Sequence, residues 1–545
     1  MEEDKSVNRR KFFFNSAAFA GALLTGITLF MLIAPVKAQN KNVVLIISDD
    51  QGFTELGAYM DFAHANTLNT PNADYYKSID RISDLEAPID VCFEAARKCM
   101  PNVDKLYQMG ARFTSFYAAP TCAPSRAALL TALYPQRYGI YSNDDMEKSE
   151  GLALDALSTV KYLQDAGYMT GMVGKWHLGD TEGRHPNDVG FDYFFGFNNS
   201  WAEKYESEIL FRNRQNIPAK GWLADQTSEE AIEFLKRADA SGQPFFLKVS
   251  YNEPHGPVPP PPQKYMDSIN SGSENLDVHF GTLYGMDYGI GEILKQLEKM
   301  GASENTLIMF GSDNGVGRLR FLRGFVKNDP SWTKFSDYMV PVPGNGPLRG
   351  CKWTVFEGAV RVPFIAYLPG MKGGQTFSSL VSIMDVMPTV MKYAGIKPEN
   401  KLDGKSFLSI LKNNEDNFER NSLIWACDVM EPFDLPDKND EAFITNRVTE
   451  NLKILNKKSD FIRSEGNPPG WFIIKDNWKL MGIDTLRPVL FNLSQDISES
   501  NDLSFRYPDK VKMMFSEFRN WLDEMNKPVV YSEEQYEKLF KIEIQ

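Results

Sequence analysis

The stretch Val43-Val44-Leu45-Ile46-Ile47-Ser48-Asp49-Asp50 is an apolar, largely β-branched run that ends in a serine and two carboxylates. Four more short apolar runs without polar alternation follow along the chain, at residues 168–173, 244–249, 306–310 and 362–367. Runs of this kind are typical of parallel strands buried on both faces. Helical patterns separate them, such as Leu157, Val160 and Leu163 followed by Gly167. The alternation predicts an α/β fold with a large, mostly parallel sheet sandwiched by helices.

From about residue 420 onward the pattern changes. Short strand-like runs at residues 471–475, 478–481 and 489–493 are separated by turn residues, which is typical of an antiparallel sheet. A helical pattern then starts at Pro508 and carries its apolar residues on one face. We therefore expect a catalytic domain over residues 39–419 and a smaller α+β subdomain over residues 420–545.

The N-terminal residues read as a targeting signal. Asn8-Arg9-Arg10-Lys11-Phe12-Phe13 precede an apolar stretch that runs to about residue 33, and Val36-Lys37-Ala38 follow it. This order predicts a signal peptide over residues 1–38, read by the general secretory or the twin-arginine pathway; an uncleaved anchor helix is the alternative. We expect a periplasmic or secreted protein without stable membrane insertion after signal removal, since no later stretch is long and apolar enough to span a bilayer.

Charge and cysteine content exclude some classes of protein. Acidic residues outnumber basic residues by 72 to 59, for a net charge of −13, so we expect no nucleic-acid partner. Five cysteines in 545 residues exclude a disulfide scaffold. Cys92 and Cys99 could form a disulfide in an oxidising compartment or stay as two thiols, and the sequence leaves both readings open.

Polar side chains follow four of the predicted strands. In an open parallel sheet these positions meet at one edge, where ligands bind. Taken singly, an Asp pair can be a helix cap and a histidine a structural imidazole, but four strand ends in succession predict a site. Oxygen ligands alone suit Ca²⁺ or Mg²⁺ and fit zinc poorly. The expected metal ligands are Asp49, Asp50, Asp313 and Asn314, with Lys175, His177 and His255 at the neighbouring strand ends.

The segment Thr121-Cys122-Ala123-Pro124-Ser125-Arg126 resembles the Cys-x-Pro-Ser-Arg signature of the formylglycine-dependent sulfatases, within the alkaline phosphatase superfamily. Composition alone would make Cys122 a buried core residue. Further stretches resemble family motifs in family order, at residues 100–106, 174–179, 254–255, 312–315, 347–352, 357–363, 385–389, 402–404 and 476–480. The resemblance implies an alkaline-phosphatase-like fold and a sulfuric ester hydrolase.

The resemblance also implies how the site works. A maturation enzyme would oxidise Cys122 to 3-oxoalanine (formylglycine), whose hydrate attacks sulfur with one hydroxyl and releases sulfate through the other. The activating ion would be Ca²⁺, with Mg²⁺ as the alternative. By family position, Arg126 and Lys175 stabilise the oxidised side chain and His177 is the base. His255 and Lys352 bind sulfate oxygens and protonate the departing alcohol.

The expected substrate is a sulfated carbohydrate, such as a marine algal galactan. Candidate substrate-binding residues are His185, Arg318, Arg320 and Arg323. Two other functions stay open at this point: a phosphonate or phosphate monoester hydrolase with the same centre, and a sulfated-glycan binding protein whose Cys122 is never oxidised.

Overall fold

The computed structural model describes residues 41–62, 89–156, 158–198, 209–256, 258–317, 344–428, 469–483 and 487–529. A ten-stranded mixed sheet forms its centre, with the strand order β11-β2-β10-β9-β1-β8-β4-β5-β6-β7. The middle strands β9, β1, β8, β4 and β5 are mutually parallel. In sheet order the bounds are β11 Gln375–Phe377, β2 Ala111–Phe113, β10 Phe364–Tyr367, β9 Thr306–Ser312, β1 Asn42–Ser48, β8 Phe245–Ser250, β4 Met169–Lys175, β5 Tyr193–Phe197, β6 Ile209–Arg212 and β7 Gln215–Pro218.

The run at residues 43–47 forms β1, and all seven residues of this strand are buried. Its side chains alternate between two hydrophobic cores, with Val43, Leu45 and Ile47 in one and Val44 and Ile46 in the other. Both faces of the sheet are therefore covered, as expected for a parallel strand without polar alternation.

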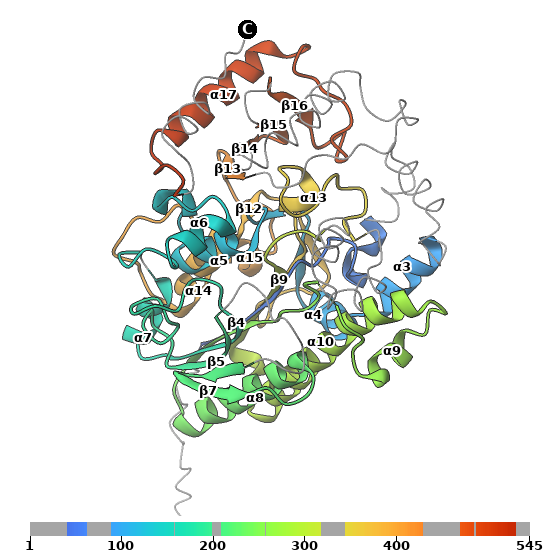
Figure 1. Ribbon diagram of the computed structural model, residues 1–545, viewed down its shortest axis with the longest axis vertical. Coiled ribbons are helices and arrows are strands. Elements are labelled where there is room, and N and C mark those ends of the chain that lie inside the picture. Colours follow the sequence, from blue (N-terminus) through green and yellow to red (C-terminus); the bar gives the residue numbers. More distant parts are fainter. Residues whose placement is uncertain are drawn as a thin grey trace, which may run out of the picture. The chain divides into compact units, whose positions relative to one another are not determined.

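Helices cover the two faces of the sheet (Figure 1). Residues of α5, α7, α14 and α15 belong to the first core, and residues of α3, α4, α8 and α10 belong to the second. Among the described residues, no helix combines the length and the apolar character that crossing a membrane requires. The helix bounds are η1 Gly57–Tyr59, α3 Ile89–Lys98, α4 Pro101–Met109, α5 Cys122–Thr131, η2 Pro135–Tyr138, α6 Asn143–Lys148, α7 Thr159–Asp165, α8 Leu223–Ser241, α9 Gln263–Ile269, α10 Glu274–Lys299, η3 Ser303–Asn305, α13 Glu357–Val360, η5 Ile383–Asp385, α14 Val386–Ala394, α15 Leu408–Asn413 and α17 Pro508–Leu522.

The C-terminal part contains a separate antiparallel sheet of four strands, β13 Leu423–Asp428, β14 Pro469–Lys475, β15 Trp478–Ile483 and β16 Val489–Asn492. Along β14, Trp471 and Ile473 face α17, whereas Phe472 and Ile474 join the first core of the large sheet. Trp471 stacks on Phe518 of α17 with ring centroids 4.1 Å apart. The small sheet thus packs between α17 and the large core. A further two-stranded parallel sheet joins β3 Phe116–Tyr117 to β12 Val381–Ser382.

The predicted fold class is confirmed, with one strand direction wrong. The run at residues 362–367 forms β10, but β10 lies antiparallel to both β9 and β2. A strand buried on both faces reads as apolar whichever way it runs, and its direction depends on the path of the connecting chain. The strands β2, β3, β5, β6, β7, β11, β12 and β13 were not predicted. The boundary at residue 420 and the signal at residues 1–38 stay predictions, and the signal lies outside the described residues.

The two cysteines of the α3 region are not joined in a disulfide. Cys92 and Cys99 are both buried thiols. Cys99 Sγ lies 3.1 Å from the carbonyl oxygen of Ala96, to which it donates. Of the two readings that the sequence left open, the structure shows the reduced one.

Candidate active site

The carboxyl ends of the central strands are in register, and this aligns the polar residues that follow them. Ser48 of β1 pairs with Ser312 of β9, so that Asp49 and Asp313 come next on adjacent strands. The strand β8 ends beside β1, and β4 ends beside β8 on the side away from β1. The backbone N–H of Asp50 donates to Asp313 Oδ1 at 3.3 Å, and that of Asp49 donates to the Glu253 carbonyl oxygen at 3.0 Å. Asp50 has φ 62°, a left-handed conformation that aspartate tolerates better than most residues do.

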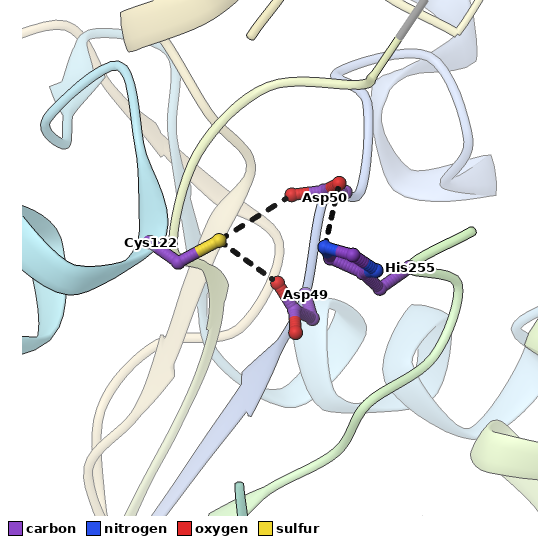
Figure 2. Close-up of side chains that lie close together, drawn as sticks. All are labelled: Asp49, Asp50, Cys122 and His255. Carbon is purple, nitrogen blue, oxygen red and sulfur yellow. Dashed lines mark hydrogen bonds and ion pairs between the residues drawn. The ribbon is translucent and has the colours of Figure 1, made fainter. Parts of the chain in front are cut away.

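Cys122 is the first residue of α5, a helix that is buried along its whole length. Thr121 precedes it in extended conformation without capping through its own side chain. Asn143 instead accepts a hydrogen bond from the backbone N–H of Ala123 at 3.0 Å. The helix start therefore directs the Cys122 side chain toward the strand ends, as Figure 2 shows. Cys122 Sγ lies 3.5 Å from Asp49 Oδ1 and 3.9 Å from Asp50 Oδ1.

Three cations pair with the three carboxylates. Lys175 Nζ lies 2.5 Å from Asp49 Oδ2, and Lys352 Nζ lies 2.6 Å from Asp50 Oδ1. Arg126 donates to Asp313 Oδ2 through both Nε, at 3.0 Å, and Nη2, at 2.7 Å. Lys352 Nζ also lies 3.0 Å from Cys122 Sγ. The formal charges of these six side chains therefore sum to zero.

Burial and these neighbours set the protonation states. Burial raises the pKa of the Cys122 thiol to about 12, although Lys175 and Lys352 oppose the shift, so the unmodified side chain is a thiol near neutral pH. Burial would also raise the pKa of Asp49, but Lys175, His255 and Arg126 together hold it below its usual value. Burial is the largest influence on the pKa of Lys352 and would lower it, but Asp50, Cys122, Asp49 and Asp313 together outweigh burial and the pKa rises.

The two histidines at the strand ends have different surroundings. His177 is 5% exposed, and neither ring nitrogen has a hydrogen-bond partner in the described structure. Burial, followed by Lys175 and Arg126, holds the pKa of His177 well below its usual value, so this imidazole is neutral. His255 Nδ1 lies 2.7 Å from the carbonyl oxygen of Gly256, which can only accept, so Nδ1 carries a hydrogen. Its Nε2 lies 3.6 Å from Asp50 Oδ2.

The donor set fits a hard divalent cation. Ligand atoms of Asp49, Asp50, Cys122 and His255 all lie within 4.8 Å of one another. Asn314 Nδ2 donates to Asp50 Oδ1 at 2.7 Å, and Asn314 Oδ1 is a buried acceptor with no hydrogen-bond partner among the described residues. Carboxylate and amide oxygens suit Ca²⁺ or Mg²⁺. A divalent ion would change the summed charge of the site from zero to +2, which favours an anionic substrate.

Hydrogen bonds, ion pairs and short contacts join nine of the ten residues predicted as catalytic groups or metal ligands, across the strand ends, α5 and the segment around Lys352. The tenth, His177, follows β4, and after burial the charges of Lys175 and Arg126 are the next causes of its lowered pKa. The candidate substrate-binding residues are less well described. His185 is 4% exposed, accepts a hydrogen bond from the backbone N–H of Asn187 at 3.2 Å, and packs edge-on against Phe194. Arg318, Arg320 and Arg323 lie outside the described residues.

The sequence analysis missed Trp353. This residue has φ 65°, a strained conformation for an aromatic side chain, and its ring lies 4.8 Å from Lys352 Nζ. It was not detectable from the sequence, because nothing in the order of residues marks a left-handed tryptophan.

Comparisons with known proteins place the chain beside relatives of known family. The sulfatase family model matches residues 41–396. An uncharacterized sulfatase of Escherichia coli K12, YdeN, is 30% identical over 529 residues, which cover 90% of this chain and 86% of that protein. The N-acetylgalactosamine-6-sulfatase of Rattus norvegicus is 29% identical over 421 residues, 71% of this chain and 68% of that protein. The crystal structure of Ps i-CgsB in complex with k-i-k-neocarrahexaose has a TM-score of 0.68 and 25% identity, and covers 92% of this chain and 100% of the other.

Proposed function

Because this chain belongs to the sulfatase family, we propose that it hydrolyses sulfate esters of a sulfated carbohydrate with an aldehyde derived from Cys122 at the reacting centre. One observation carries the proposal. Cys122 Sγ lies 3.5 Å from a carboxylate oxygen of Asp49 and 3.0 Å from the ammonium of Lys352. A group at this position meets cation-binding oxygens and a fixed positive charge together, which transfer of an anionic sulfuryl group requires.

The nucleophile is the oxidised form of Cys122. Hydrated 3-oxoalanine carries two hydroxyl groups on one carbon, one to attack sulfur and one to expel sulfate in a second step. Lys175 and Arg126 fix the surroundings of this side chain, because both are buried and both pair with the carboxylates that face it. Oxidation requires a formylglycine-generating maturation enzyme, which we propose as a partner of the chain.

A Ca²⁺ ion, with Mg²⁺ as the alternative, would be held by Asp49, Asp50, Asp313 and Asn314, and it supplies Lewis-acid activation of the attacking hydroxyl. The chain keeps these four side chains from solvent, since Asp50 is 6% exposed and the other three are fully buried. Their low exposure preserves the strength of the electrostatic interactions during reaction.

The neutral imidazole of His177 accepts a proton from the second hydroxyl at its unprotonated ring nitrogen, since neither nitrogen is hydrogen-bonded to another described residue. His255 and Lys352 bind the sulfate oxygens and deliver a proton to the departing alcohol. For His255 this requires the doubly protonated imidazolium, which gives up the proton on Nε2 and keeps the Nδ1 hydrogen on the Gly256 carbonyl.

The substrate that we propose is a sulfated oligosaccharide or polysaccharide, with a sulfated galactan as the first choice. The support is the rat relative, named for a sulfated amino sugar, and the similar structure that contains neocarrahexaose. We also propose that the chain acts outside the cytoplasm, in the periplasm or after secretion, on the strength of the signal-like pattern in residues 1–38.

The test uses the chain co-expressed with a formylglycine-generating enzyme and a panel of defined sulfated oligosaccharides. Inorganic sulfate released by the wild type, and none by Cys122→Ala, is the expected result. Matched aryl phosphate and phosphonate esters run beside the sulfate esters. Faster release from the phosphorus esters would replace the proposal by the alternative hydrolase, and binding without any release would replace it by a glycan-binding role.

A further inference from the structure

A buried cluster of charges joins the C-terminal sheet to the segment that carries Lys352. Lys479 of β15 lies 2.9 Å from Glu357 Oε1, at the start of α13, and 2.8 Å from Glu499 Oε1. Arg361 Nη1 lies 3.4 Å from Glu357 Oε2, to which the Tyr117 hydroxyl also donates at 2.8 Å. We call Glu357, Arg361, Lys479 and Glu499 the buried ion cluster. Lys479, Glu357 and Glu499 are fully buried, and Arg361 is 6% exposed.

Burying four ionisable side chains costs free energy, so the pairing of these side chains must offset that cost. Charges in a protein interior are tolerated only when they are paired and hydrogen-bonded. Burial would raise the pKa of Glu357, but Lys479 and Arg361 hold it below its usual value, so this carboxylate is ionised. Glu499 has φ 52°, a left-handed conformation that is strained for a residue other than glycine. This backbone conformation directs the Glu499 carboxylate toward the cluster.

Ser498 and Glu499 together contact both ends of residues 347–357, the Lys352 segment. At one end, the backbone N–H of Glu357 donates to Glu499 Oε2 at 2.7 Å. At the other end, Arg349 Nη1 donates to the carbonyl oxygen of Glu499 at 2.9 Å, and the Ser498 hydroxyl donates to the carbonyl oxygen of Pro347 at 2.9 Å. The residues around Glu499 therefore hold the segment on either side of Lys352.

Backbone hydrogen bonds of the Lys352 segment connect it to the active site. The backbone N–H of Gly358 donates to the Arg349 carbonyl at 2.6 Å, which closes the segment into a loop. The backbone N–H of Lys352 donates to the Val316 carbonyl at 2.9 Å, and that of Trp353 donates to the Pro120 carbonyl at 3.0 Å, two residues before Cys122. Figure 1 shows α13, at the end of this loop, near the strands of the C-terminal sheet.

We propose that Lys479 and Glu499 are positioning residues, which fix the Lys352 segment so that the Lys352 ammonium faces Cys122. The active site is then complete only when the C-terminal sheet is docked. This inference rests on the proposed function, because it takes Lys352 as a sulfate-binding group. It goes further by assigning the C-terminal part a role in the chemistry of a site to which none of that part's described residues contributes a side chain.

The test is a double-mutant cycle between Glu499→Gln and Lys352→Met. Glutamine keeps an acceptor for the Glu357 N–H and leaves Lys479 paired with Glu357, so the variant is expected to fold. Glu499→Gln should lower kcat/KM for an aryl sulfate about tenfold in the wild type but by less than about twofold in the Lys352→Met background, because coupled residues give non-additive effects. Lys479→Met is also expected to lower kcat/KM, and to lower it less in the Lys352→Met background. Equal losses in both backgrounds would show a general structural effect and overturn the proposal.

Lys475→Met is the matched control. Lys475 lies on β14 of the same small sheet and pairs with Glu517 at 2.7 Å, without contacting the Lys352 segment. It should leave kcat/KM unchanged.

Hydrogen–deuterium exchange gives a readout that needs no activity. Glu499→Gln should speed exchange of the amides of residues 349–356 but not those of α5, and unchanged exchange would overturn the proposal. A wild type without sulfate-ester activity whose Glu499→Gln variant still shows faster exchange would reject the proposed function alone. An active wild type with an additive cycle would reject the positioning role alone.

Discussion

Replacing Lys352 by methionine tests the electrostatic design of the site most directly. The change removes the ammonium that lies 2.6 Å from Asp50 Oδ1 and 3.0 Å from Cys122 Sγ, while keeping most of the side-chain volume. Removing one group aimed at developing charge typically costs about 2.7–4 kcal/mol, which predicts a fall in kcat of about 10²–10³-fold. Asp50 also loses its closest cation, and breaking a buried pair costs about 3–5 kcal/mol of stability.

The assay measures kcat and KM for an aryl sulfate, with thermal melting to establish that the variant is folded at the assay temperature. Lys248→Met is the matched control, because Lys248 is also buried but its Nζ contacts Ser250 Oγ, at 2.5 Å, and Met172 Sδ rather than a carboxylate. Burial, with Arg126 as a smaller cause, holds the pKa of Lys248 well below its usual value, so no ion pair is lost. A volume-conserving change there should cost less than about 1.5 kcal/mol and leave kcat near that of the wild type. A folded Lys352→Met with kcat/KM within about threefold of the wild type would refute the electrostatic argument.

Three further predictions concern the nucleophile, the cation and a buried carboxyl. Native protein labelled with a hydrazide probe should carry the label on the peptide of Cys122, whereas Cys122→Ala should carry none and turn over no substrate; an unlabelled peptide in active protein would exclude the aldehyde. Chelation should lower both activity and melting temperature, and Ca²⁺ at about 100 times its Kd should restore about 2.7 kcal/mol of stability; a melting temperature indifferent to chelator would count against a bound cation. Burial raises the pKa of Asp104 to about 6, so its ionised form destabilises the fold and stability should fall as the pH rises from about 4 to 6. Asp104→Asn should remove that loss, amounting to about 3 kcal/mol at pH 8, in urea unfolding at pH 4 and pH 8; an unchanged pH dependence would contradict the assignment.

Much of the fold follows from patterns that act over short distances. The runs around residues 43–47 and 306–310 identify strands because burial on both faces leaves no polar positions. The helix that starts at Pro508 is visible because its apolar residues share one face. The direction of β10 was wrong because an apolar run is the same in either direction. The strand β5 was missed because Tyr193–Phe197 is short and contains Gly196.

Some residues of the candidate site could likewise be predicted from local sequence, and others could not. The order of residues places Asp49, Asp50, Asp313 and Asn314 at strand ends, and parallel strands end at one edge of a sheet, so their meeting follows from the fold class. Lys352 follows no predicted strand, and only its resemblance to a family motif singled it out. No sequence pattern predicted the pairing of Lys479 with Glu357, which lie 122 positions apart.

The sequence by itself thus determined the long buried strands, some of the helices and the polar residues that follow those strands, because periodicity and turn residues act within a few positions of the chain. Only the tertiary structure decided which charges meet. It places Lys352 against Cys122 across 230 positions, leaves both ring nitrogens of His177 without a hydrogen-bond partner among the described residues, and balances three carboxylates with three cations. The reason is that an ionic contact depends on distance in space and on exclusion of water, and both are set when distant segments pack together.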